Sequence, residues 1–178
     1  MFPVRPLTAS VWFGRLLERL CLSANATMLN EDYRDMLQAL ADEKVKFLLV
    51  GAYALAAHGY PRATMDIDIW VMPSPDNADA VLRALNRFGA PLENLTRKDL
   101  QADGTIFQIG IAPRRIDIIT TASGLQFEAT YRNSIPVTIE GIEVRIPSID
   151  DLILNKRAIG RTKDLADAEA LESLKDSE

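Results

Sequence analysis

The sequence predicts an α/β domain with a mixed β-sheet flanked by helices. Three observations point to this class. Short apolar runs typical of buried strands alternate with amphipathic stretches typical of surface helices in the first half of the chain. Several strand-like segments then follow one another in the middle, and two helical segments close the chain. The predicted order is helix, strand, helix, strand, helix, four strands and two helices, without repeats or low-complexity segments.

The first elements are marked by clear start and stop signals. Asn30 is a plausible N-cap for a helix that runs to about Asp42. The apolar run "KFLLV" (46–50) is typical of a central strand. Gly51 follows at once, and we expect a short helix over 52–59.

The middle of the chain alternates between strands and turns. The segment "TMDIDIWVM" (64–72) predicts a second strand, and "NADAVLRALNRFG" (77–89) predicts an amphipathic helix. Two further strands are expected over 105–111 and 114–120. The segment 135–147 has the pattern of a hairpin that turns at Glu-Gly.

Two helices are expected at the end of the chain, with Ser148 and Thr162 as their N-caps. The domain is expected to span residues 28–178, because a clean domain start follows Met28. Residues 1–27 are interpreted as an N-terminal extension that contains an amphipathic helix.

The composition excludes several classes of protein. At 178 residues, with 48% hydrophobic and 25% charged residues, the chain is typical of one globular domain. The net charge of -5 gives no overall footprint for nucleic acid or an anionic membrane. No apolar run approaches the roughly 18 residues that span a bilayer. Because a single cysteine forms no intrachain disulfide, we expect a cytoplasmic protein.

Three carboxylates lie in segments that otherwise resemble buried strands. Asp66 and Asp68 are two residues apart, so they share one face of their strand. Asp117 interrupts the apolar strand "RRIDIIT". Mg²⁺ prefers such oxygen ligands together with substrate phosphates, and Gly51 lets backbone approach a ligand closely. The alternatives are a solvated sheet face for the first pair, and an ion pair with Arg114 or Arg115 for Asp117.

The segment "FLLVGAYALAAHGYPRATMDIDIWV" resembles the nucleotidyltransferase superfamily, the fold of DNA polymerase β-like enzymes. Gly51, Asp66, Asp68 and Asp117 fill the positions of that family's motif in order. The resemblance implies a two-metal Mg²⁺ site in which the three aspartates are both metal ligands and catalytic residues. Ala52 stands where the family usually has glycine or serine, so that position offers no hydroxyl to a phosphate.

The C-terminal "LILNKRAIGRTKDLADAEAL" is similar to motifs of small abortive-infection toxins of this superfamily. The similarity places Lys156 near the nucleotide phosphates. Arg161, Lys163 and Asp164 are expected to line the site or brace the helix pair, and Asp167 to brace it. From their position just before the aspartates, Arg62 is expected to reach a phosphate and Thr64 to orient a carboxylate. The nucleotide-binding set is therefore Gly51, Ala52, Arg62, Thr64, Lys156, Arg161 and Lys163.

The function expected from this resemblance is metal-dependent transfer of a nucleoside monophosphate from a nucleoside triphosphate, such as ATP, to an acceptor. The acceptor stays open between tRNA or another RNA, a protein and a small molecule. A toxin of a toxin–antitoxin pair is one version of this function, with an antitoxin or a second copy of the chain as partner, and no membrane. The alternative is a non-catalytic nucleotide-binding or regulatory module that keeps the fold.

Overall fold

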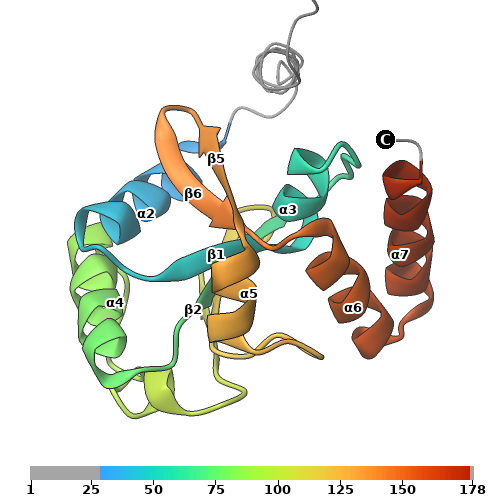
Figure 1. Ribbon diagram of the computed structural model, residues 1–178. Coiled ribbons are helices and arrows are strands. Elements are labelled where there is room, and N and C mark those ends of the chain that lie inside the picture. The colour runs from blue at the N-terminus through green and yellow to red at the C-terminus, as the bar shows by residue number, and fades with distance from the viewer. Residues whose placement is uncertain (1–28, 177–178) are drawn as a thin grey trace, which may run out of the picture.

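A computed structural model describes residues 29–176 as a four-stranded sheet, a separate hairpin and surrounding helices (Figure 1). The predicted extension over 1–27 lies outside the described residues. The strands are β1 (Phe47–Val50), β2 (Asp66–Val71), β3 (Ile106–Ile109), β4 (Arg115–Ile119), β5 (Ile135–Ile139) and β6 (Ile142–Ile146). The helices are α2 (Glu31–Asp42), α3 (Gly51–Ala57), α4 (Pro75–Phe88), the 3-10 turn η1 (Asp99–Gln101), α5 (Phe127–Asn133), α6 (Ile149–Ile159) and α7 (Thr162–Lys175).

The main sheet is mixed, as predicted, with the strand order β1-β2-β4-β3. Strands β2 and β4 are parallel, whereas β1 and β3 are antiparallel to their neighbours. The β5–β6 hairpin forms its own two-stranded sheet. The parallel pair β2–β4 at the centre is the part that brings distant acidic residues together.

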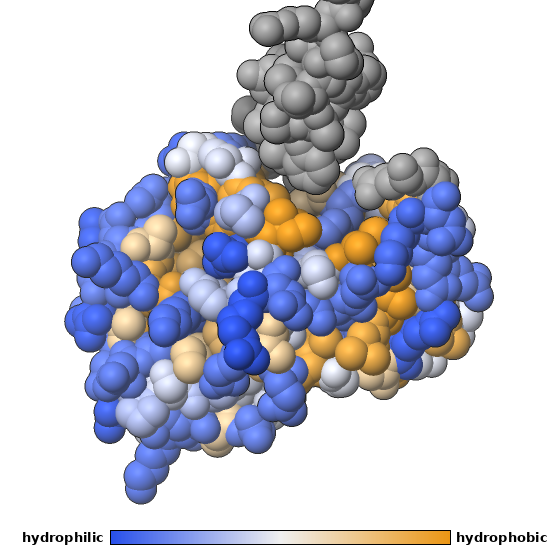
Figure 2. Space-filling model, viewed as in Figure 1, coloured by the Kyte–Doolittle hydropathy of each residue, from blue (hydrophilic) through white to orange (hydrophobic). Residues whose placement is uncertain are grey.

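One face of the main sheet forms the large apolar core. Ile67 and Ile69 of β2 and Ile118 of β4 point to this face and are fully buried. They belong to one cluster with Met36 of α2 and Leu85 of α4, which are also fully buried. Hydrophilic residues cover the outer sides of α4 and α7 (Figure 2). Burial of the apolar face of the sheet fixes the strand register, because a slip of one residue would bury the aspartates instead.

The opposite face of the sheet is divided into an apolar and an acidic part. In the apolar part Trp70 packs edge-on against Phe127 of α5, with ring centroids 5.1 Å apart. The Trp70 indole N–H donates to the carbonyl of Thr120 over 3.0 Å. The acidic part begins two residues earlier on β2, at Asp68. Helix α5 was not predicted from the sequence, and it covers the apolar part.

The helix boundaries agree with most predicted caps. Asn30 accepts from the backbone N–H of Tyr33, and Ser148 accepts from that of Asp151. The prediction of Thr162 as an N-cap is wrong, because Thr162 is the first residue of α7 and Arg161 holds the cap position. Gly160 ends α6 in the left-handed conformation, so only Gly160 and Arg161 separate the two helices.

Helix α4 begins at Pro75 rather than at residue 77. Proline is favoured in the first helical turn, where its missing N–H has no partner to lose. Among residues 29–176, no helix is both long enough and apolar enough to cross a bilayer.

Candidate active site

The register of β2 and β4 places the three predicted aspartates on one face of the sheet. Asp68 is paired with Asp117 across the parallel strands, and Asp66 is paired with Arg115. Paired residues in neighbouring strands point to the same side, and such strands lie about 4.8 Å apart. The side chains at positions 66, 68 and 117 therefore meet at one point of the sheet, although Asp68 and Asp117 are 49 positions apart in the sequence.

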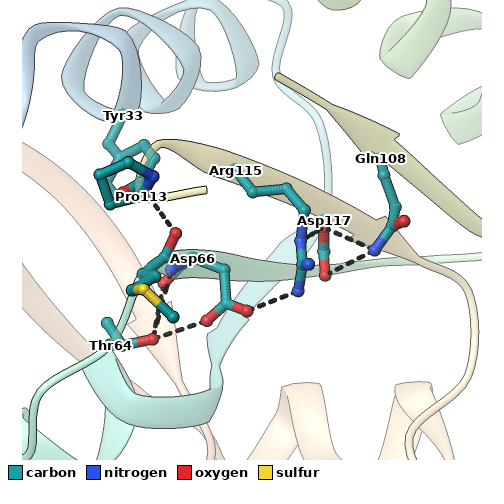
Figure 3. Close-up of polar contacts among 8 residues, drawn as sticks. Tyr33, Thr64, Asp66, Gln108, Pro113, Arg115 and Asp117 are labelled. Carbon is teal, nitrogen blue, oxygen red and sulfur yellow. Dashed lines mark hydrogen bonds and ion pairs between the residues drawn. The ribbon is translucent and has the colours of Figure 1, made fainter. Parts of the chain in front are cut away.

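Arg115 connects two of these carboxylates directly (Figure 3). Its Nη2 donates to Asp66 Oδ2 over 2.6 Å, and its Nε donates to Asp117 Oδ1 over 2.9 Å. Thr64 Oγ1 donates to the other oxygen of Asp66 over 2.6 Å, and Gln108 Nε2 lies 3.3 Å from both oxygens of Asp117. Both carboxylates are thus held by hydrogen bonds, and they share the single positive charge of Arg115.

Asp68 lies in a different environment from its two neighbours. Within residues 29–176 it makes no hydrogen bond and no ion pair, and its side chain is half-buried. Burial, followed by the negative charges of Asp66 and Asp117, raises the pKa of Asp68 to about 6, although Lys156 and Arg115 oppose the shift. This carboxylate is therefore the one in the cluster that most lacks a positive partner.

Gly51 lets α3 begin directly against Asp68. Its φ is 64°, in the left-handed region that favours glycine. A Cβ at this position would overlap the Asp68 Oδ2 atom. Glycine is therefore required both by the backbone conformation and by the carboxylate that rests against it.

A pocket of about 350 Å³ opens beside the aspartates. It contains three of the predicted nucleotide-binding residues, and its lining consists of Ala52, Tyr53, Ala56, Pro61, Arg62, Ala63 and Thr64. Burial, with contributions from Tyr33 and Asp66, raises the pKa of Tyr53 to about 12. Tyr53 therefore lines the pocket as a neutral side chain at neutral pH.

A buried charge cluster links the loop before β2 to α6 and α7. Lys156 Nζ lies 2.9 Å from Asp164 Oδ1 and 3.6 Å from Asp167 Oδ2. Arg62 pairs with Asp167, and Arg161 Nε lies 2.6 Å from Asp164 Oδ2. Burial alone would raise the pKa of Asp164, but the hydrogen bonds from Arg161 and Lys156 outweigh this and lower it.

The predicted nucleotide-binding residues thus fall into three groups. Gly51, Ala52 and Thr64 lie at the aspartates or in the adjacent pocket. Arg62 lines the pocket but pairs with a carboxylate of α7. Lys156 lies in the buried charge cluster, Arg161 pairs with that cluster from the surface, and Lys163 is exposed on α7. The role of these residues toward a nucleotide stays a prediction.

The aspartates fit a divalent metal only in part in this arrangement. No group of three or more His, Cys, Asp or Glu side chains suited to a metal ion is gathered in the described part of the chain. Asp68 and Asp117 are adjacent, and Asp68 lacks a donor and rests in the space left by Gly51. Oxygen ligands of this kind suit Mg²⁺. Asp68 could bind a metal without any rearrangement, and Asp66 and Asp117 could join it if Arg115 moved.

Two residues of this site were not predicted as functional. Gln108 lies opposite Asp117 in the antiparallel pair β3–β4. The sequence alone does not show the register of this strand pair. Arg115 was considered only as one of two possible ion-pair partners. The alternation of side chains along a strand could have selected it over Arg114, because Arg115 and Asp117 are two residues apart and share a face.

The elevated pKa of Asp68 predicts a stability that depends on pH. Above pH 6 the folded wild type holds an ionised, half-buried Asp68, at a cost of up to about 3 kcal/mol for a shift of this size. Asp68→Asn should therefore be more stable than wild type at pH 8. The difference should shrink as the pH falls from 6 to 4 and vanish below, where Asp68 is protonated in both states.

Urea unfolding of the metal-free protein at several pH values measures this difference. Asp103→Asn, which changes an exposed aspartate outside the site, is the matched control and should show no such trend. A wild type as stable as Asp68→Asn at pH 8 would contradict the prediction.

Comparison with known proteins identifies a family and structural neighbours. A family model described as "Nucleotidyltransferase of unknown function (DUF6036)" matches residues 22–176. Among curated proteins none matches this chain. Among solved structures, a proposed nucleotidyltransferase (TM1012) from Thermotoga maritima matches with a TM-score of 0.53 and 16% identity, over 87% of this chain and 99% of that chain. The likeness to TM1012 confirms the predicted fold.

Proposed function

The chain belongs to the nucleotidyltransferase family described as of unknown function (DUF6036), and from this premise we propose that it transfers a nucleoside monophosphate from a nucleoside triphosphate to an acceptor hydroxyl. The observation that carries the proposal is the pairing of Asp68 with Asp117 beside Gly51. A half-buried carboxylate without a donor is costly to keep unless a cation binds it. The site therefore has the properties of a cation-binding centre that is held ready by the fold.

In the proposed reaction the acceptor oxygen forms a bond to the α-phosphorus, the bond to the bridging oxygen breaks, and pyrophosphate leaves. Asp66, Asp68 and Asp117 would hold Mg²⁺, which when bound neutralises phosphate charge and aligns the attacking and leaving oxygens. Asp117 is the residue proposed to accept the proton of the acceptor hydroxyl. Thr64 orients Asp66 by the hydrogen bond described above.

The pocket beside the aspartates is the proposed place for part of the nucleotide. Ala52 and Thr64 line it, and Arg62 adds positive charge at its wall. Because Lys156 and Arg161 are paired with buried carboxylates, they are proposed to act on the phosphates chiefly through their charge. Lys163 is free of ion pairs within residues 29–176, and its exposed side chain remains a proposed phosphate contact.

The test is release of pyrophosphate by the purified protein with Mg²⁺ or Mn²⁺ and each of ATP, GTP, CTP and UTP. The acceptors to be supplied are tRNA, a mixture of proteins and hydroxyl-bearing small molecules, with α-labelled nucleotide to identify the product. Transfer of label to one class would identify the acceptor. Release of pyrophosphate without a labelled acceptor would contradict group transfer, because the nucleotide would then pass only to water.

A second candidate function is a non-catalytic nucleotide-binding module, and one observation favours it. Arg115 already forms ion pairs with both Asp66 and Asp117, so these two carboxylates have a partner without a metal. Calorimetric titration with the four Mg²⁺–nucleotide complexes measures binding, and the pyrophosphate assay measures turnover. Together they separate the candidates. Binding without any turnover favours the module, whereas binding with turnover favours the enzyme. A toxin role, with an antitoxin or a second copy of the chain as partner, is a further proposal that this titration does not address.

A further inference from the structure

We infer that Arg115 is an internal counter-cation that competes with a divalent metal for Asp66 and Asp117. The inference rests on the proposed function, because it assumes that these carboxylates bind a metal during the reaction. It adds a role for a residue outside the predicted metal and nucleotide ligands. Arg115 would keep two of the three carboxylates closed to metal until its guanidinium moves to another anion.

The hydrogen bonds divide the three carboxylates into an open and a closed set. Each oxygen of Asp66 has a donor, from Thr64 on one side and from Arg115 on the other. Asp117 accepts a hydrogen bond from Arg115 Nε and a longer one from Gln108 Nε2. Asp68 has no donor among the described side chains. A metal that reached the site would find Asp68 available, but it would have to replace Arg115 at the other two carboxylates.

The Arg115 guanidinium can free the two carboxylates only by moving away from them, because it cannot lose its charge. Arginine does not lose its proton in proteins, so its charge persists at any working pH. The Arg115 side chain is 34% exposed and emerges at the surface of the sheet, so movement does not require the core to open. By contrast, the aspartates are fixed by the strand register.

A nucleoside triphosphate offers the guanidinium a suitable new partner. Arginine binds phosphate oxygens in the same two-pronged way as carboxylates. If Arg115 moves from the carboxylates to a phosphate, the nucleotide frees the ligands that the metal needs. Metal and nucleotide would then strengthen each other's binding, and metal alone would bind weakly.

The experiment measures Mn²⁺ binding to the protein without nucleotide, from the electron paramagnetic resonance signal of free Mn²⁺. Arg115→Met removes the charge and keeps the length of the side chain. We expect it to bind Mn²⁺ about tenfold more tightly than wild type, because a positive charge beside the site is lost. Arg115→Lys cannot bridge two carboxylates as a planar fork does, and should lie between the two.

Arg114→Met is the matched control, because it removes the same charge one residue away. Arg114 is exposed and makes no side-chain hydrogen bond or ion pair within residues 29–176. Its substitution should change Mn²⁺ affinity by no more than about twofold, as expected for a screened surface charge. Adding Asp68→Asn to Arg115→Met should abolish the gain, which would locate the bound Mn²⁺ at this cluster.

Circular dichroism checks that each variant is folded, and Arg115→Lys carries the test if Arg115→Met does not fold. Equal Mn²⁺ affinity in wild type and the folded Arg115 variants would overturn the inference and leave the proposed function intact. Weaker binding in Arg115→Met would also overturn it, since Arg115 would then support the site. Absence of Mn²⁺ binding in every variant would overturn both the inference and the proposed metal dependence.

Discussion

Replacing Asp66 and Asp68 together by alanine is expected to reduce pyrophosphate release roughly a thousandfold, as for other groups that act in a transition state. Both side chains project from β2 on the face that carries Asp117. Their removal takes away two of the three carboxylates proposed to hold the metal. Asp117 alone, paired with Arg115, would not replace them.

Initial rates at saturating nucleotide, with the acceptor identified by labelling, measure this loss. Asp32→Ala combined with Asp103→Ala removes two exposed carboxylates elsewhere and should leave the rate within about twofold, as for most surface changes. Asp68→Asn supplies a second variant whose fold is expected to be more stable than wild type at neutral pH. Unchanged activity in the double variant would rule out the proposed site.

The sheet could be predicted because its signals are local. Alternation along β2 put Asp66 and Asp68 on one face and Ile67 and Ile69 on the other, and the structure has this arrangement. The closing helices carried N-cap or glycine signals at their ends. The separation of the β5–β6 hairpin from the main sheet was not predictable, because a strand pattern does not show which strand lies beside it.

Helix α5 could not be predicted because its stability comes from tertiary contacts. It has only seven residues, fewer than an isolated helix needs to be stable. Its Phe127 packs against Trp70 and stacks on Tyr131 with ring centroids 5.5 Å apart. The contact with Trp70 depends on a residue more than 50 positions earlier in the chain.

The site could be predicted as a set of residues but not as a set of contacts. The sequence placed Asp117 on a strand, and only the register shows that it faces Asp68. The positive residues were predicted as nucleotide ligands from their motif. Lys156 lies between Asp164 and Asp167 because of the way α6 packs against α7. The spacing of residues across the turn between the helices does not determine this packing.

Gly51→Ala is expected to disable the site by displacing the side chain of a neighbouring residue, Asp68. The new Cβ would overlap Asp68 Oδ2, so the carboxylate would have to move away from Asp117. We expect pyrophosphate release to fall by at least about a hundredfold, in line with the loss of a metal ligand's position. The left-handed φ adds about 1–2 kcal/mol of destabilisation for any residue with a Cβ.

Gly59→Ala separates these two effects. Its φ is 90°, also in the left-handed region, but a Cβ there meets no atom within 4 Å. It should therefore lose stability to a similar extent from backbone strain and keep its activity. A Gly51→Ala variant as active as Gly59→Ala would show that Asp68 is not needed in the position the structure gives it.

Combining Gly51→Ala with Asp68→Ala tests whether the overlap itself is responsible. Removing the carboxylate removes the atoms that the new Cβ would meet, so the two substitutions should be less destabilising together than the sum of their separate effects. Urea unfolding of the two single variants and the double variant measures this coupling. Strict additivity would mean that the strain of Gly51→Ala comes from φ alone. A favourable coupling would show that this chain requires glycine at position 51 because Asp68 is held against it.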